Sequence, residues 1–343
     1  MSDLIRHPWA DPPGPGEALE IAEGLLWLRL PLPMKLDHVN VFALAEPEGW
    51  TLVDTGLDWT RGREALEAAL AGPLGGRPVT RLLITHHHPD HIGMAGLLQE
   101  RFGAELITTR TSFLMARMLT LDVQDRPSDA SQAFAAASGL SADRLAARRD
   151  ARPFNFADVV AGFGPSYTRI QDGEVIVLGG RRWLVRVGHG HAPEHVTLWE
   201  EDGPLVLAGD QILPGISPHL GLYLTEPDAD PVRDWIAACR DLRAFARPDH
   251  LVLPGHKTPF TGLAARLDQL IENHVSALDR IAAHLSVPRR APDCFVTLFK
   301  REIGEAEYAL ALSETLAHLN ALRHAGRARR EIDADGVWQW HGN

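Results

Sequence analysis

The feature that most constrains this chain is a histidine-rich run that follows an apolar stretch at residues 80–84, namely Thr85-His86-His87-His88-Pro89-Asp90-His91. The apolar stretch predicts a buried strand, and Pro89 suits the first turn of a helix. His86 and His88 then alternate on the extended connection, while Asp90 and His91 begin the helix. This strand-to-helix connection predicts an α/β fold in which four polar side chains converge on one point.

Imidazole and carboxylate groups are the ligands that a borderline divalent ion such as zinc prefers. An open loop between a strand and a helix also leaves room for water as a further ligand. The spacing therefore predicts a metal site with ligands for two ions. The alternative is a solvated histidine-rich loop, which a single motif does not exclude.

Four further segments put ligand-type residues at the ends of expected strands. They are Val53-Asp54-Thr55-Gly56, Gly190-His191-Ala192-Pro193-Glu194-His195, Leu207-Ala208-Gly209-Asp210 and Leu253-Pro254-Gly255-His256. Strand ends that share one sheet edge bring such side chains together, which argues against the solvated loop.

In this order, over residues 20 to 285, the motifs resemble those of the metallo-beta-lactamase superfamily. The resemblance implies an α/β fold, a four-layer αββα sandwich that binds metal at one edge. It implies that one ion is held by His86, His88 and His191, a second by Asp90, His91 and His256, and that Asp210 bridges them. It also implies a hydroxide between two zinc ions, with iron or manganese left open. Asp54 and His195 are expected to lie behind the ligands and to orient them.

The rest of the chain divides into predicted blocks. Short β-rich runs fill residues 20–55 and 167–213, and amphipathic helices are expected at 231–245 and about 261–285. A helical insertion at about 110–165 could be a lid over the metal site or an interface. We expect the sandwich to occupy residues 1–286 and a second domain to occupy 287–343.

The pattern of segment 287–343 predicts two helices followed by a hairpin, and it resembles the winged-helix extension of lactamase-beta-like hydrolases. A winged helix that reads DNA carries a basic face. This segment has eight Lys or Arg residues against eight Asp or Glu residues. Its neutrality favours a wall packed against its own protein over a DNA-binding module.

Charge and cysteine content limit the binding partners and the cellular compartment that the sequence predicts. The chain has 34 Lys and Arg residues against 45 Asp and Glu residues, a formal charge of -11, which disfavours nucleic acid and anionic lipid as partners. Its two cysteines lie far apart and form no thiolate motif. Neither a signal peptide nor an apolar span of about 18 residues is seen. These features predict a cytoplasmic protein outside the membrane, and a homodimer is left open.

The predicted function is that of a dinuclear metal hydrolase that attacks an ester, thioester or lactone bond of a small, partly apolar molecule with a metal-bound hydroxide. Asp90 or Asp210 would carry the proton to the leaving group. An RNA phosphodiesterase and a mononuclear-iron oxygenase of the persulfide dioxygenase type are the alternatives. His219, Tyr223 and Lys257 are the candidate substrate contacts.

Overall fold

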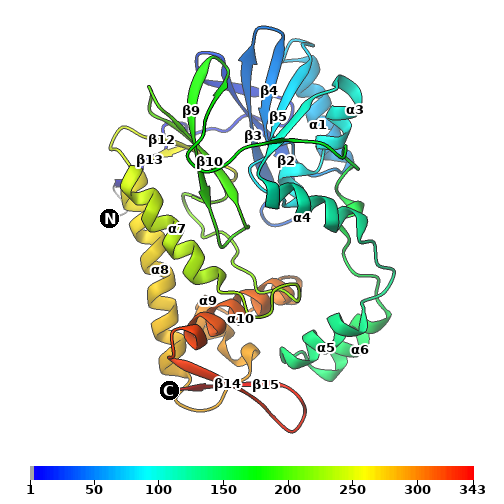
Figure 1. Ribbon diagram of the computed structural model, residues 1–343, viewed down its shortest axis with the longest axis vertical. Helices are drawn as coiled ribbons and strands as arrows, with labels where there is room; N and C mark the ends of the chain where they lie inside the picture. Colours follow the sequence, from blue (N-terminus) through cyan, green and yellow to red (C-terminus); the bar gives the residue numbers. More distant parts are fainter. Residues whose placement is uncertain (1–3) are drawn as a thin grey trace. The chain divides into compact units, whose positions relative to one another are not determined.

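The first of the two large β-sheets begins near the N-terminus in the computed structural model, which describes residues 4–343 (Figure 1). Its strands lie in the order of the sequence, the first four antiparallel and the last four parallel. They are β1 (Ala18–Ala22), β2 (Leu25–Pro31), β3 (His38–Glu46), β4 (Gly49–Val53), β5 (Val79–Leu83), β6 (Glu105–Thr108) and β7 (Thr168–Arg169). The predicted antiparallel strands of residues 20–55 are thus β1 to β4.

The second sheet has the order β13-β12-β11-β10-β9-β8, and only β11 and β12 pair in parallel. Its strands are β8 (Val175–Leu178), β9 (Arg181–Gly188), β10 (His195–Glu200), β11 (Leu205–Gly209), β12 (Leu251–Pro254) and β13 (Phe260–Thr261). The central strands β10 and β11 are buried along their whole length, because each sheet face is covered by another layer.

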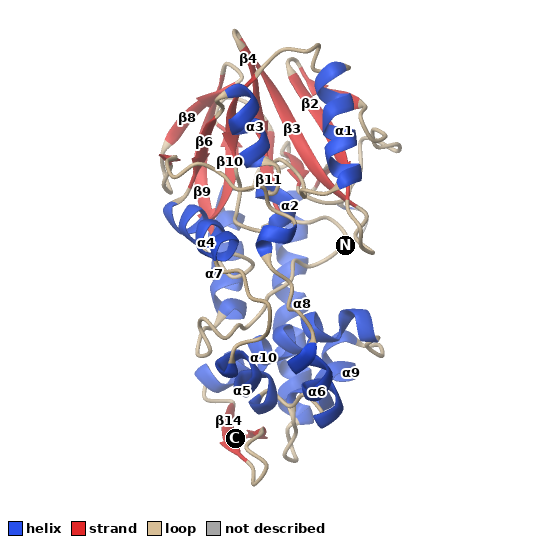
Figure 2. Cartoon of the chain, turned by 90° about the vertical axis from the view of Figure 1, so that its right-hand side faces the viewer, coloured by secondary structure: helices blue, strands red, loops and turns tan. Residues whose placement is uncertain are grey.

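Apolar side chains from both sheets form the central core. Trp27 and Phe42 of the first sheet pack with Trp183 and Leu198 of the second, and all four are at most 2% exposed. On the outer face of the first sheet, α1 (Thr60–Ala71) and α3 (Ala95–Phe102) bury a second apolar cluster (Figure 2). On the outer face of the second, Trp199 and Arg186 contact Phe245, near the end of a long helix. The predicted αββα sandwich is confirmed.

The remaining helices and the terminal hairpin complete the fold. They are α2 (Pro89–Ile92), α4 (Arg110–Leu121), α5 (Asp129–Ala137), α6 (Ala142–Asp150), α7 (Pro231–Phe245), α8 (Leu263–His284), α9 (Phe295–Phe299), α10 (Tyr308–His324), and the strands β14 (Ala328–Ile332) and β15 (Trp338–Gly342). Short 3₁₀ turns lie at Phe156–Asp158, Ala291–Cys294 and Glu305–Glu307. Among the helices of residues 4–343, none combines the length and the apolar character that a membrane span requires.

The predictions for the second half of the chain can be compared with these elements. The insertion predicted at 110–165 contains the helices α4, α5 and α6, and the tail ends in the expected hairpin. A C-terminal domain is therefore present.

The chain forms two compact units that are interleaved along the sequence. The first contains Met1–Val123, Asn155–Pro218 and Leu242–Leu267, and the second contains Gln124–Phe154, His219–Asp241 and Asp268–Asn343. The unit boundary thus falls inside α7 and α8. The predicted domains, 1–286 and 287–343, are instead consecutive segments, and the winged-helix description of the tail stays a prediction.

Contacts inside the second unit explain why α5 and α6 belong to it. Phe134 of α5 lies edge-on to Trp338 of the hairpin, with 5.5 Å between the ring centres. Arg144 of α6 forms an ion pair with Glu305. The first of the two helices predicted in segment 287–343 is the short α9, which ends where Lys300 takes a left-handed backbone conformation at φ 57°.

A buried pair of imidazoles lies between α8 and α10 in this unit. His274 Nδ1 is 3.1 Å from His318 Nε2, and His318 Nδ1 is 2.8 Å from the Glu314 carbonyl oxygen. His318 therefore donates to the carbonyl and accepts from His274. Burial, together with the neighbouring His318, lowers the pKa of His274 to about 3.

This pair predicts acid sensitivity. An unfolded histidine titrates near pH 6.5, so between about pH 6.5 and 3 the folded protein binds fewer protons at His274 than the unfolded protein. The free energy of unfolding should fall as the pH falls through that window, by up to about 1.4 kcal/mol per pH unit. In metal-free protein, His274→Gln should lower the melting temperature at pH 7.5 but make its decline toward pH 5 shallower. An equally steep decline in the variant would contradict this assignment.

Candidate metal centre

Seven His and Asp side chains from four separate segments meet in the first unit. Their ligand atoms form three overlapping groups in which all atoms lie within 4.8 Å of one another. The groups are His86, His88 and His191; His86, His91 and Asp210; and Asp90, His91 and His256. The structure thus brings together all seven residues that the sequence predicts as metal ligands. Two of the groups match the predicted ion sites and the third joins His86, His91 and Asp210, while the binding of metal by these residues stays a prediction.

Asp210 belongs to the group that shares His86 and His91 with the other two. It follows β11 directly, and its side chain is 8% exposed. Its Oδ1 is 3.5 Å from His91 Nε2, and its Oδ2 is 3.5 Å from His191 Nε2 and 3.1 Å from His256 Nε2. One carboxylate therefore contacts imidazoles of both predicted ion sites, the arrangement that a bridging ligand requires.

Asp54 fixes the rings of the histidine-rich loop. Its carboxylate accepts from the Thr85 backbone N–H at 2.8 Å and from the Thr85 hydroxyl, and its Oδ2 lies 2.7 Å from His91 Nδ1. The His91 ring then donates from Nδ1, which leaves its Nε2 facing the cluster. His86 Nδ1 lies 3.0 Å from the same Thr85 hydroxyl. Asp54 and Thr85 thus orient two of the predicted ligands.

His195 lies outside all three groups. Its Nε2 accepts from the Asp210 backbone N–H at 3.1 Å, and its ring stacks on His86 with 4.5 Å between centres. A Cβ atom on Gly209 would lie 2.6 Å from His195 Cε1, which explains the glycine before Asp210. His195 therefore supports the backbone that carries Asp210.

The loop between His191 and His195 is tied to α4 by Glu194. The Glu194 carboxylate accepts from the Thr111 backbone N–H at 2.8 Å, and its carbonyl accepts from the Thr109 hydroxyl at 2.9 Å. Glu194 does this in a left-handed backbone conformation, with φ 51°. The start of α4 is thereby held beside the loop that carries His191.

Two supporting residues of β3 escaped the sequence analysis. The His38 carbonyl oxygen accepts from His256 Nδ1 at 2.7 Å, and Asn40 donates its side-chain N–H to the carbonyl oxygens of Pro254 and Lys257. Both residues are buried. Polar side chains in the otherwise apolar run 38–45 were the available signal, but their partners lie more than 210 residues away.

Charge is balanced inside the cluster. Burial alone would lower the pKa of His91, but the carboxylates of Asp210, Asp90 and Asp54 raise it well above its usual value. Burial is opposed in the same way at His256, where Asp210 and Asp90 raise the pKa to about 10. Burial and the charge of His91 hold the pKa of His86 well below its usual range.

The donor atoms fit divalent cations. His91 Nε2 and Asp210 Oδ1 are buried and lie 3.5 Å apart, and within residues 4–343 neither makes a hydrogen bond at normal distance. A cation satisfies an imidazole lone pair and a carboxylate at once, and nitrogen and oxygen ligands suit zinc, iron or manganese.

The three predicted substrate contacts have different surroundings. Lys257 follows His256 in a left-handed conformation at φ 69°. His219 and Tyr223 belong to the second unit, where His219 lies 3.2 Å from both the Glu314 carboxylate and the Ser313 hydroxyl. The role of all three in substrate binding stays a prediction.

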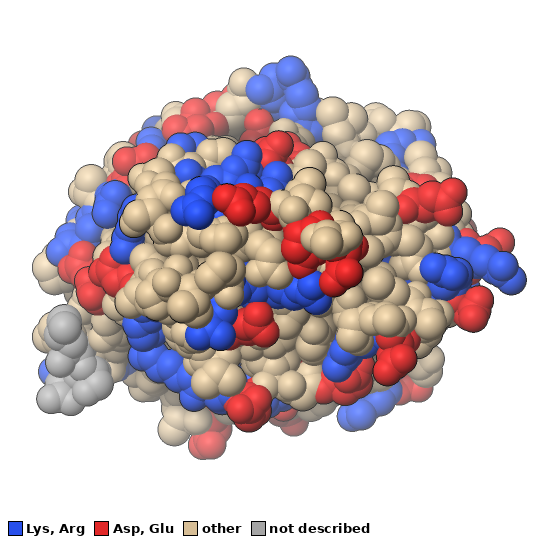
Figure 3. Space-filling model, turned by 90° about the horizontal axis from the view of Figure 1, so that it is seen from below, with Lys and Arg blue, Asp and Glu red and all other residues tan. Residues whose placement is uncertain are grey.

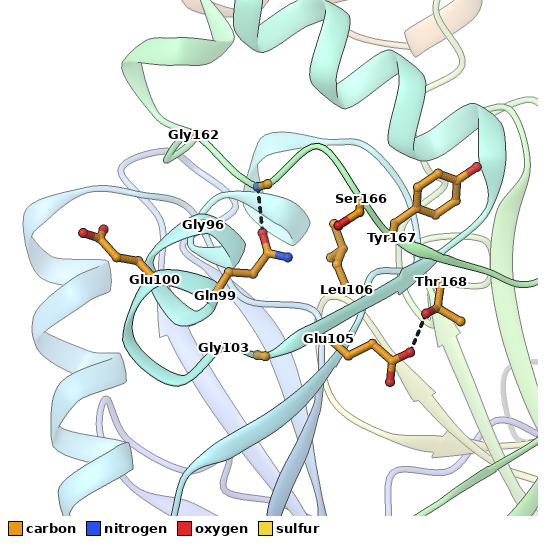
Figure 4. A pocket seen from close by; sticks show the side chains of 12 residues that line it. Gly96, Gln99, Glu100, Gly103, Glu105, Leu106, Gly162, Ser166, Tyr167 and Thr168 are labelled. Atoms are coloured by element: carbon orange, nitrogen blue, oxygen red, sulfur yellow. Dashed lines mark hydrogen bonds between the residues drawn. The ribbon is translucent and has the colours of Figure 1, made fainter.

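A pocket of about 670 Å³ lies elsewhere in the first unit, between α3, β6 and residues 162–168 (Figure 4). In it Gln99 accepts from the Gly164 N–H at 3.0 Å, and Glu105 accepts from the Thr168 hydroxyl. None of the seven clustered residues lines this pocket. This pocket is therefore separate from the cluster of predicted metal ligands.

Comparisons with known proteins agree with this architecture. The model of the metallo-beta-lactamase superfamily matches residues 34–256, and that of the metallo-beta-lactamase-like C-terminal domain matches residues 278–343. The probable metallo-hydrolase YqjP of Bacillus subtilis (strain 168) is 26% identical over 310 residues, which are 88% of this chain and 92% of that protein.

Two crystal structures are similar over nearly the whole chain. A beta-lactamase domain protein from Burkholderia ambifaria has a TM-score of 0.89 at 33% identity, and the match covers 100% of this chain and 98% of that one. A metallo-beta-lactamase family protein from Thermus thermophilus has a TM-score of 0.78 at 27% identity, covering 94% and 100%. The similarity thus includes the second unit as well as the sandwich.

Metal binding should release protons. With the pKa of His256 at about 10, its ring carries a second proton at pH 7.5 in the metal-free protein, and a cation can bind its Nε2 only after that proton leaves. The raised pKa of His91 acts in the same direction. Affinity for the ion at Asp90, His91 and His256 should therefore rise with pH, by about tenfold per pH unit for each proton released. Titration calorimetry in two buffers of different ionisation enthalpy measures the proton count, and a buffer-independent heat would refute the prediction.

Gly255 should be essential for metal binding. A Cβ atom there would lie 2.2 Å from Asp210 Oδ1 and 3.0 Å from His91 Cε1, so Gly255→Ala must displace Asp210. We expect metal affinity to fall by at least the roughly 10- to 100-fold that follows loss of an orienting contact. Gly215→Ala is the matched control, because a Cβ there meets nothing within 4 Å. Equal affinities of the two variants in a chelator competition assay would contradict this interpretation.

Proposed function

This chain belongs to the metallo-beta-lactamase superfamily, and we propose that it is a dinuclear metal-dependent hydrolase that cleaves an ester, thioester or lactone bond of a small, partly apolar molecule. The observation that carries the proposal is the convergence of seven His and Asp side chains into three overlapping ligand groups, one of which contains Asp210. When bound there, two divalent cations would supply a nucleophilic water at neutral pH and polarise the substrate carbonyl.

The residues of the chain would do the orienting. Asp54 and the His38 carbonyl each hold the Nδ1 atom of one imidazole, so that His91 and His256 present Nε2 to the centre. Asp210, which contacts three imidazoles, would keep the ligands of the two predicted ion sites at a fixed separation.

Asp90 is the better candidate for proton transfer to the leaving group. Its side chain is 19% exposed, against 8% for Asp210 and 3% for Asp54. A group that exchanges a proton with substrate needs access to it, whereas Asp210 is enclosed by imidazoles. We therefore assign the proton-carrying role to Asp90 rather than Asp210.

The apolar part of the proposed substrate is supported by α4. Leu114, Met118 and Leu121 recur at helical spacing and are 55%, 48% and 69% exposed. The helix starts where Glu194 ties it to the loop of His191. Flexible exposed side chains of this kind suit contact with an acyl or alkyl group.

Charge supports a small molecule over RNA. Arg290 pairs with Asp333, Arg327 with Asp279 and Arg329 with Glu331, so these tail arginines are engaged by local acids. Figure 3 shows Lys and Arg side chains interspersed with Asp and Glu on the face that it draws. Polynucleotide binding needs several Lys or Arg side chains that are not paired with acidic residues. The complete set Asp90, His91 and His256 likewise favours two ions over a single iron.

The test combines metal content with a substrate panel. Purified protein should bind about two divalent ions and hydrolyse at least one lactone, thioester or carboxylic ester, and a chelator should abolish turnover. Asp210→Ala should lose activity and metal, whereas Asp54→Ala should lose about 10- to 100-fold. One bound iron with oxygen consumption on a persulfide, or RNA cleavage without ester hydrolysis, would overturn the proposal.

A further inference from the structure

The turn that carries His256 is held by hydrogen bonds from outside it. The Asn40 backbone N–H donates to the Gly255 carbonyl at 2.7 Å, and its side-chain N–H groups donate to Pro254 and Lys257 carbonyls, each at 2.8 Å. Asn40 Oδ1 in turn accepts from Trp27 Nε1 at 2.9 Å. Strand β3 therefore determines the path of this turn.

His38, two residues earlier on β3, contacts the same turn twice. Its carbonyl oxygen accepts from His256 Nδ1 at 2.7 Å, and its ring Nε2 lies 2.8 Å from the Lys257 backbone nitrogen. A backbone N–H can only donate, so Nε2 carries the lone pair. The proton of the neutral ring is then on Nδ1, which donates to Asp37 at 2.6 Å; the Arg29 guanidinium, which can only donate, lies 2.5 Å from the same nitrogen.

The bond to Lys257 falls at a strained residue. Lys257 has a φ of 69°, a conformation that costs a non-glycine residue about 1–3 kcal/mol unless its surroundings impose it. The His38 ring satisfies the N–H of this residue in that conformation. Without the ring acceptor, the N–H loses its partner and the turn loses a restraint next to His256.

We propose that the His38 side chain is a positioning residue for the second ion, acting through the 254–257 turn to keep His256 aimed at Asp90 and Asp210. His256 Nε2 lies 3.4 Å from Asp90 Oδ2 and 3.1 Å from Asp210 Oδ2, and its orientation depends on the bond from Nδ1 to the His38 carbonyl. This inference rests on the proposed dinuclear site. It predicts that loss of the ring acceptor lowers the affinity for the second ion and leaves the affinity for the first ion unchanged.

Three variants separate this role from simple packing. His38→Phe keeps a buried ring but has no acceptor, and His38→Gln keeps an acceptor able to reach the Lys257 N–H. His250→Phe is the control, because His250 is only 2% exposed, lies at the opposite end of β12, and accepts from the Arg247 backbone N–H at 3.0 Å through its ring. His38 is similarly buried, at 3% exposed.

Each variant is freed of metal and titrated with Zn²⁺ against a competing chelator, with the melting temperature of the metal-free form measured in parallel. We expect His38→Phe to lower the affinity for the second ion by about 10- to 100-fold, while the first ion binds as in the unchanged protein. His38→Gln should recover most of the affinity, and His250→Phe should bind both ions normally.

The outcomes separate this inference from the proposed function. If the unchanged protein binds two ions and His38→Phe binds the second equally well, the inference is wrong and the dinuclear proposal stands. Equal weakening in His38→Phe and His38→Gln, or in the His250 control, would also reject it, because an acceptor at residue 38 would then not matter. An unchanged protein that binds only one ion overturns both.

Discussion

Asp210 is a buried carboxylate enclosed by three imidazoles, and its charge can persist there only because positive charge lies beside it. Burial would raise its pKa, yet His256 and His91 hold the pKa well below its usual value. The neighbouring backbone is shaped to allow this enclosure: Gly209 leaves space for His195, and Gly255 leaves space for Asp210 itself. The ends of β5, β11 and β12 therefore meet at one electrostatic centre, and the sandwich is the scaffold that brings them there.

Ligand-type residues that follow apolar runs marked the candidates for the metal site, and the resemblance to a known family supplied their division between two ions. His86, Asp210 and His256 all stand just beyond a buried strand, so local sequence is enough to propose them. His38 and Asn40 act through strand pairing and through bonds to backbone groups at 254–257, which no local pattern reveals. The shortness of α9 was not predicted, because the left-handed conformation of Lys300 that ends it has no glycine to signal it in the sequence.

The order of the two units along the chain was also beyond local patterns. Composition changes near Pro288, yet α5, α6 and residues 219–241 belong to the same unit as the tail. What joins them is tertiary contact, such as Phe134 with Trp338 and Asn320 with the Ala229 carbonyl. Helix propensity predicts helices in these segments, but it does not predict which hydrophobic core they share.

The interleaving of the units has a consequence for biosynthesis. The second unit consists of three stretches, and Trp340, one of its fully buried side chains, lies 186 residues after Phe154. Residues 124–154 therefore leave the ribosome long before the partners that cover them exist. At about 5–20 residues per second, they stay without those partners for roughly 10 to 40 seconds. Ser128 and Ser141 cap the N-termini of α5 and α6, and α6 has no buried residue. Both features suit helices that are exposed to solvent until their partner segments have been synthesised.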